Sequence, residues 1–191
     1  GNAHDNGLSA HRLVDLNGDG RIDIVYAGDN LGNMWKFDLT SDISSEWSVA
    51  FGGSPLFTAR GLSSLSSSVR NMVQPITVAP VARANDRKKC LQFQTENGVK
   101  SCKADKVEAV GGMMVSFGTG RNVATGDPAS VDVQTVYSVL DNTRYQARYT
   151  DAAKTQLKVC ALTGCPPPMA LGVGVTTAGL VKRSIAVANI S

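Results

Sequence analysis

The chain has 191 residues, of which 42% are hydrophobic and only 18% are charged, with a formal net charge of +3. This length can bury a core, and the many glycines and small polar residues favour a loop-rich β protein over a helical bundle. The lysines and arginines are scattered, which argues against a nucleic-acid partner, because such partners call for a basic face. No run of about 18 apolar residues occurs, so no helix is expected to span a membrane.

The sequence is interpreted as a single domain over residues 1–191, or as a fragment of one. Its opening residues, GNAHDNGLSAHRL, contain no apolar segment of the kind found in a signal peptide. We therefore expect either that a signal was removed or that the chain is an internal piece of a longer protein.

An acidic loop comes first along the chain. Oxygen-bearing side chains recur at positions 1, 3, 5 and 9 of the stretch that begins at Asp15, and a glycine, Gly20, stands at position 6. This spacing matches the first three-quarters of an EF-hand calcium loop, in which alternate side chains converge on one hard cation. The predicted calcium ligands are Asp15, Asn17, Asp19, Arg21 (through its backbone carbonyl) and Asp23.

Two features separate this loop from a true EF-hand. Tyr26 stands at position 12 in place of the bidentate glutamate, and no helix is predicted on either side, so Asp23 would close the site from within a strand. The alternative is an Asx-rich turn without an ion, although three carboxylates within nine residues repel one another unless a cation compensates. Magnesium suits the loop less well because it resists dehydration. Acid–base catalysis is not predicted, since no nucleophile or histidine accompanies the aspartates at this spacing.

A hairpin is predicted directly after the loop. The segment IDIVYA at 22–27 is apolar on both faces, which indicates a buried strand. GDNLGN at 28–33 consists of residues that tolerate positive φ and predicts a turn, and MWKFDL at 34–39 predicts the return strand. Alternation places three residues of the return strand on one side: Trp35, Phe37 and Leu39.

Period-two alternation continues along the chain and predicts further strands. No segment sustains a helical period over three turns, and a short turn of helix is expected only at 151–156. The segment GLSSLSSS at 61–68 is predicted to be flexible and polar. The further strands are expected at 47–51, 76–82, 90–94, 112–118, 135–140, 157–162 and 184–190.

The four cysteines fall into two local pairs. Cys90 and Cys102 flank a predicted strand, an Asn-Gly turn and a short return, whereas Cys160 and Cys165 flank a tight loop before a run of prolines. Such placement predicts two disulfides and an oxidising compartment. Free buried thiols or a zinc site are the alternatives, but zinc favours closer cysteine spacing or support from histidine.

A weak internal repeat relates two of the predicted hairpins. VYAGD at 25–29 matches VSFGT at 115–119, and MWKFD at 34–38 resembles VYSVLD at 136–141. Each copy contains an apolar strand, a glycine at its end, a polar turn, and an aromatic-bearing return strand that closes on aspartate. Repeated antiparallel hairpins of this kind indicate the blades of a β-propeller.

Four motifs, in this order, resemble the PilC/PilY family of type IV pilus tip adhesins and biogenesis factors of Gram-negative bacteria. They are DLNGDGRIDIVYAGDNLGNMWKFDL, VQPITVAPV, MMVSFGTGRN and VQTVYSVLDN. The resemblance is to the family's C-terminal propeller. It implies an all-β fold of propeller-like antiparallel blades with few helices, here partial or shortened, and it implies that the acidic loop holds Ca2+.

The resemblance also implies a function. It points to a non-enzymatic protein that supports pilus biogenesis, adhesion and twitching motility, with calcium linked to pilus extension and retraction. The expected partners are pilin or minor pilins and a host surface. The expected location is the periplasm, the outer-membrane surface or the pilus tip. No Arg-Gly-Asp motif occurs, so integrin binding is not carried over.

Two other functions stay open on the sequence. A quinoprotein dehydrogenase has propeller blades with similar hairpins, but Trp35 and Trp47 both occupy hairpin-like positions and indicate no cofactor-stacking pocket. A generic calcium-stabilised extracellular interaction module would differ from the pilus protein only in its partner.

Overall fold

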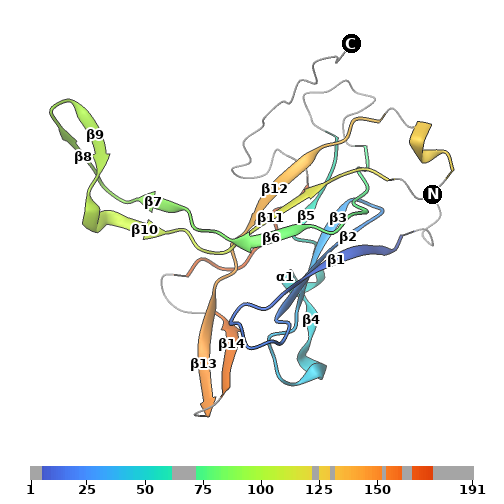
Figure 1. Ribbon diagram of the computed structural model, residues 1–191, viewed down its shortest axis with the longest axis horizontal. Coiled ribbons are helices and arrows are strands. Elements are labelled where there is room, and N and C mark those ends of the chain that lie inside the picture. The colour runs from blue at the N-terminus through green and yellow to red at the C-terminus, as the bar shows by residue number, and fades with distance from the viewer. Residues whose placement is uncertain are drawn as a thin grey trace.

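The computed structural model describes residues 6–61, 72–121, 125–129, 132–151, 154–160 and 165–173. The regular structure in these ranges is almost entirely β-strand, as predicted, and the strands within each sheet pair antiparallel (Figure 1). No helix in the described ranges is long and apolar enough to cross a membrane. The predicted strand at 184–190 and nearly all of the polar segment at 61–68 lie outside the described residues. Within the described ranges the helical elements are α1 (Ala50–Gly53) and three 3-10 turns, η1 (Ser44–Glu46), η2 (Ala104–Lys106) and η3 (Asp127–Ala129).

The first sheet contains the predicted hairpin. β2 (Ile24–Asp29) is buried along almost its whole length and pairs with β3 (Asn33–Asp38), with Ile24 opposite Asp38 and Gly28 opposite Met34. β1 (Leu8–Val14) pairs with the other edge of β2 and was not predicted, because most of its residues are exposed and show no alternation. Two short strands, β4 (Ser48–Val49) and β5 (Phe57–Thr58), pair with opposite ends of β3.

The second sheet contains the other half of the internal repeat. β11 (Met113–Gly118) is its central strand and lies between β6 (Val81–Ala84) and β12 (Val136–Asp141). In the β11–β12 hairpin, Met113 lies opposite Asp141 and Gly118 lies opposite Val136. The strands predicted at 112–118 and 135–140 are therefore confirmed. Both repeats are hairpins, and each return strand ends on an aspartate.

These two aspartates make the same local turn. Asp38 accepts hydrogen bonds at Oδ1 from the backbone N–H (3.0 Å) and the hydroxyl (2.6 Å) of Thr40. Asp141 accepts the same pair at Oδ1 from Thr143, at 2.9 Å and 2.6 Å. The repeat therefore extends past the strands into an Asp-x-Thr turn, which stops each strand by giving its next N–H a side-chain acceptor.

Between β6 and β11 the chain leaves the second sheet as a projecting arm, residues 85–110 (Figure 1). β7 (Lys88–Cys90) pairs with β10 (Val107–Ala109), and further out β8 (Phe93–Glu96) pairs with β9 (Val99–Cys102). The single strand predicted at 90–94 is thus split, because the chain bends between β7 and β8.

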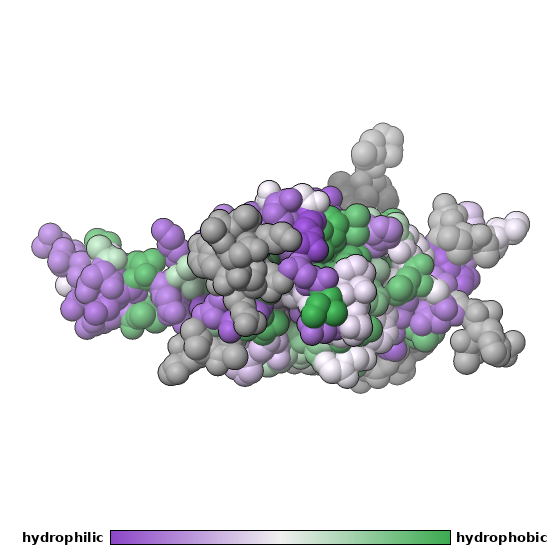
Figure 2. Space-filling model, turned by 90° about the horizontal axis from the view of Figure 1, so that it is seen from below, coloured by the Kyte–Doolittle hydropathy of each residue, from purple (hydrophilic) through white to green (hydrophobic). Residues whose placement is uncertain are grey.

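The arm is held together locally. The predicted disulfide between Cys90 and Cys102 joins its two hairpins, with the Cα atoms 5.7 Å apart. Asn97 and Gly98 make the outer turn with φ of 50° and 78°, as a two-residue hairpin requires. The surface of the arm is mainly hydrophilic, with a few apolar side chains among its charges (Figure 2).

The last described hairpin pairs β13 (Tyr145–Asp151) with β14 (Lys154–Val159). The helical turn predicted at 151–156 is therefore wrong. One turn of helix fixes several residues for a single hydrogen bond, whereas Asp151 and residues 154–156 pair across the hairpin. β14 covers the start of the strand predicted at 157–162, and residues 161–162 lie outside the described residues. After it, the second predicted disulfide joins Cys160 to Cys165.

Two other predicted strands are shorter than the sequence suggested. At 76–82 only the last residues enter β6, because Pro80 lacks the N–H that a ladder needs, and Ile76 instead forms an isolated bridge with Gly120. At 47–51 the strand ends after two residues. Phe51 then turns the chain with a positive φ of 55°.

The hydrophobic core joins the two sheets. The ring of Phe57 lies 4.9 Å from that of Tyr137 and 6.1 Å from that of Phe117, measured between centroids. Ile76 packs so closely on β2 that a Cβ at Gly28 would lie 2.4 Å from its Cγ2, which is why glycine stands there. The buried core residues are Ile24, Tyr26, Met34, Leu56, Phe57, Ala59, Ile76, Met113, Val115, Phe117, Tyr137 and Val139.

Candidate functional site

The acidic loop connects β1 to β2 and is curled by hydrogen bonds to its own backbone. Asp15 accepts the N–H groups of Gly18 (2.6 Å at Oδ1) and Gly20 (2.8 Å at Oδ2). Both glycines have positive φ, 78° and 85°, which lets the chain turn sharply there. The N–H of Gly20 is the largest influence on Asp15 and lowers the pKa of its carboxyl group.

The other predicted ligands line the same turn. Asn17 accepts the N–H of Asp19 (3.1 Å), and Asp19 accepts the N–H of Arg21 (2.8 Å). The side chain of Arg21 points away and pairs with Asp42 at 2.5 Å, which leaves only its backbone for the loop.

Asp23 anchors the loop to the first sheet. Its N–H donates to Val14 (3.0 Å), its carbonyl accepts from Leu39 (2.8 Å), and its carboxylate accepts the N–H of Leu16 (2.6 Å). Asp23 is buried, whereas the earlier ligands are largely exposed. Burial raises the pKa of Asp23, and the charges of Asp19 and Asp15 add to the effect. A bound cation would relieve that repulsion.

The loop offers the chemistry of a calcium site but not an assembled cluster. Its donors are carboxylate, amide and carbonyl oxygens, which are the ligands that Ca2+ takes. Among the described residues, however, no group of three or more His, Cys, Asp or Glu side chains is gathered closely enough to hold a metal ion. The carboxylates are turned toward loop N–H groups, so holding an ion would require them to turn toward one another.

A buried ion pair, not anticipated from the sequence, lies between the two sheets. Lys36 on β3 and Asp141 on β12 are each only 1% exposed in their side chains, and Lys36 Nζ lies 2.5 Å from Asp141 Oδ2. The hydroxyl of Tyr26 donates to the same oxygen at 2.6 Å. Burial lowers the pKa of Lys36, and the charge of Asp141 limits the shift. The pair links equivalent strands of the two repeats.

Trp35 and Phe37 share one face of β3, as predicted, but the opposite face is the more deeply buried one. Met34 and Lys36 are buried, whereas Trp35 and Phe37 are only half-buried. The sequence signal for this buried ion pair was a lysine among apolar residues of a strand. Such a lysine is normally expected to face solvent unless a buried counter-charge is known. That partner, Asp141, lies 105 residues away in the sequence.

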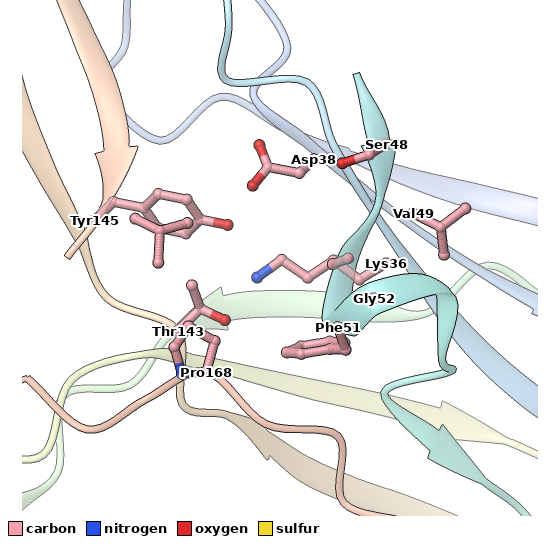
Figure 3. Close-up of a pocket in the computed structure, with 11 residues that line it drawn as sticks. Lys36, Asp38, Ser48, Val49, Phe51, Gly52, Thr143, Tyr145 and Pro168 are labelled. Carbon is pink, nitrogen blue, oxygen red and sulfur yellow. The ribbon is translucent and has the colours of Figure 1, made fainter. Parts of the chain in front are cut away.

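A cavity of about 510 Å3 adjoins this ion pair (Figure 3). Lys36 and Asp38 of β3 reach it from one side and Tyr145 of β13 from the other, while Phe51 closes it below. Burial raises the pKa of Tyr145, and the nearby charges of Asp38 and Asp141 raise it further. The Tyr145 hydroxyl therefore stays protonated and can donate a hydrogen bond.

Another buried carboxylate, Asp29, organises the turn between β2 and β3. It accepts hydrogen bonds from the backbone N–H groups of Leu31 (2.9 Å) and Asn33 (2.8 Å), and from the indole of Trp35 (2.8 Å). The side-chain amides of Asn33 and Asn6 complete the set at 2.9 Å and 3.1 Å. Burial alone raises the pKa of Asp29, but these donors outweigh it and hold the pKa below its usual value.

Repeated antiparallel hairpins on a shared core define the chain as an all-β protein of the propeller type, with sheets that do not close among the described residues. A family model described as the PilY1 beta-propeller domain matches residues 1–160, and the chain belongs to that family. This agrees with the resemblance seen in the sequence motifs.

Proteins named PilY1 or PilY1 homolog in two bacteria are similar to this chain. The type IV pilus biogenesis factor PilY1 of Pseudomonas aeruginosa is 32% identical over 155 residues, which is 71% of this chain and 11% of that protein. A PilY1 homolog of Xylella fastidiosa is 28% identical over 142 residues, 72% of this chain and 8% of that protein. This chain therefore corresponds to about a tenth of the length of these relatives.

A solved structure is also similar. The crystal structure of the Pseudomonas aeruginosa PilY1 C-terminal domain aligns with 71% of this chain and 26% of its own, at 30% identity and a TM-score of 0.48. The names of these relatives describe biogenesis factors and not enzymes, which is consistent with the predicted lack of catalysis.

Proposed function

We propose that this chain is part of the propeller of a type IV pilus biogenesis factor, and that it supports adhesion and twitching motility by contacting pilin or minor pilins. The observation that carries the proposal is the family match over residues 1–160, together with relatives named for pilus biogenesis. The two disulfides support an oxidising location, which we propose to be the periplasm, the outer-membrane surface or the pilus tip. The chain acts by binding, without a reaction of its own.

Binding to pilus subunits tests this function directly. The purified chain, immobilised on a biosensor, is expected to retain pilin or at least one minor pilin from the same bacterium. A chain with both disulfides reduced and alkylated serves as the comparison, because it keeps the composition but loses the bridges that hold the projecting arm and the end of β14. Failure of the native chain to retain any pilin or minor pilin would overturn the proposal.

We further propose that the acidic loop binds Ca2+. Asp15, Asn17, Asp19 and Asp23 would supply side-chain oxygens and Arg21 its backbone carbonyl. The ion supplies positive charge that offsets three neighbouring carboxylates. Asp23 is hydrogen-bonded to Val14 and Leu39, so a ligand set that includes it would fix the loop to β1 and to the end of β3.

Calorimetric titration distinguishes a residue that binds Ca2+ through its side chain from one that does not. We expect Ca2+ to bind the EDTA-treated chain with micromolar affinity and Asp19→Ala to lose that binding. Asp19 is exposed, so the substitution leaves the core intact. Arg21→Ala should bind like the unmodified chain, because the Arg21 side chain pairs with Asp42 outside the loop. Equal losses in the two variants, or no heat at millimolar Ca2+, would reduce the loop to an Asx-rich turn.

A further inference from the structure

The cavity beside the buried ion pair has the size and lining of a small-molecule site. Its volume of about 510 Å3 lies within the range of roughly 300–1,000 Å3 that ligand pockets occupy. It combines aromatic rings with a few polar groups that point inward (Figure 3). The residues that line it include Lys36, Asp38, Phe51 and Tyr145.

One polar group in the cavity lacks a partner. The Tyr145 hydroxyl is buried and makes no hydrogen bond with any described residue. Folded proteins pair nearly all such groups, because a buried hydroxyl without a partner costs free energy. In Figure 3 this hydroxyl points into the space between Asp38 and Lys36. A molecule bound there would receive its hydrogen bond.

Two charged groups on β3 keep unused hydrogen-bonding capacity beside that hydroxyl. Asp38 engages Thr40 through Oδ1, while its Oδ2 accepts no hydrogen bond from the described part of the chain. The Lys36 ammonium carries three protons, and Asp141 is its hydrogen-bond acceptor among the described residues. The cavity therefore presents one acceptor from Asp38 and further donors from Lys36.

The charges of these groups limit the ligand. Lys36 and Asp38 carry opposite charges, so a ligand of either charge is repelled by one of them while it is attracted by the other. A neutral hydroxyl group can both donate to Asp38 and accept from Lys36 or Tyr145. A ligand with several neutral hydroxyls on a compact frame fits all three.

The aromatic residues add an apolar wall. The rings of Phe51 and Tyr145 lie on either side of Lys36 Nζ, at 5.4 Å and 5.1 Å from their centroids. Phe51 holds its position with φ of 55° and ψ of 33°, a left-handed conformation that bulky residues rarely adopt. Strained residues of this kind cluster at ligand sites. The C–H faces of a sugar ring could pack on such a wall.

We infer that this cavity binds a neutral carbohydrate, with Asp38 accepting hydrogen bonds from sugar hydroxyls and with Tyr145 and Lys36 donating to them. The inference does not rest on the calcium loop or on the pilus partner. It would give the chain a second kind of partner, a glycan, at a site formed by β3 and β13.

Saturation-transfer NMR with the full chain tests the inference. The probes are the methyl glycosides of glucose, galactose and mannose, with glucosamine and glucuronic acid as charged counterparts. We expect transfer to at least one neutral glycoside at millimolar concentration and weaker transfer to both charged sugars. No transfer to any neutral glycoside, or preference for a charged sugar, would overturn the inference.

Two matched tyrosine substitutions separate binding from folding. Tyr145→Phe removes only the unpartnered hydroxyl, so it should weaken binding roughly tenfold without loss of thermal stability. Tyr137→Phe removes a hydroxyl that bonds to Gln74 and to the carbonyl of Arg60, outside the cavity. It should lower thermal stability and leave the glycoside affinity unchanged.

A third substitution tests the carboxylate. Asp38→Asn keeps an acceptor oxygen for Thr40 but removes the charge, and it is expected to weaken glycoside binding while the variant stays folded. Full affinity in both Tyr145→Phe and Asp38→Asn would contradict the site.

Discussion

Replacing Asp141 with alanine is expected to lower the free energy of unfolding by about 3–5 kcal/mol, because the Lys36 ammonium would be left buried without its counter-charge. The loss extends beyond the ion pair. Tyr26 would lose the acceptor for its hydroxyl, and Thr143 would lose the acceptor of both its N–H and its hydroxyl. Equilibrium unfolding in urea, with the slope checked for a constant value, measures the effect.

A double substitution tests whether the loss of stability comes from the unpaired charge of Lys36 or from removal of the Asp141 side chain itself. A double variant, Lys36→Met with Asp141→Leu, replaces both charges with apolar groups and should recover at least half of the stability lost in Asp141→Ala. The exposed pair between Lys89 and Glu108 on the projecting arm is the control, and Glu108→Ala should cost less than about 1 kcal/mol. If Asp141→Ala costs no more than Glu108→Ala, the ion pair does not hold the two sheets together.

Asp29→Ala is expected to lower the free energy of unfolding by about 2–4 kcal/mol at neutral pH, because its carboxylate is the shared acceptor of the β2–β3 turn. The indole N–H of Trp35 and the backbone N–H groups of Leu31 and Asn33 would lose their acceptor in a largely buried turn. Trp35→Phe removes a single donor and should have a smaller effect.

The effect of Asp29 should depend on pH in a defined direction. The donors hold the pKa of Asp29 in the folded protein below the ordinary value of 3.8. Its contribution to stability is therefore fully present above 3.8 and is lost as the pH falls through the lower folded pKa. Urea unfolding of the native chain and Asp29→Ala should differ by a constant amount near neutral pH and by less in strong acid. A difference that grows on acidification would contradict the assignment.

Local sequence patterns predicted much of the fold. The β2–β3 hairpin, the Asn97–Gly98 turn and both disulfides join residues that are close in the sequence, and each strand of the β11–β12 hairpin shows its own alternation, so the sequence carries these signals directly. The acidic loop belongs with them, since its spacing alone suggests the oxygen ligands. Whether those ligands hold Ca2+ stays a prediction.

Strands that form only by pairing with another segment could not be predicted from local sequence patterns. β1 has no alternation of its own and forms because β2 offers an edge to pair with. Asp151 and residues 154–156 became strand because a hairpin partner was available, whereas residues 76–80 did not because Pro80 lacks an N–H. In each case pairing with another segment decided between local alternatives.

The sequence by itself determined an all-β chain of repeated hairpins, its disulfide pairs, an oxygen-rich loop and its family, because short-range spacing encodes each of them. Only the tertiary structure decided which side of β3 is buried, how Lys36 finds Asp141, and that Tyr145 faces Asp38 across a cavity. The physical reason is separation: Lys36 and Asp141 are 105 residues apart, and their charges become partners only when the two sheets pack on one core.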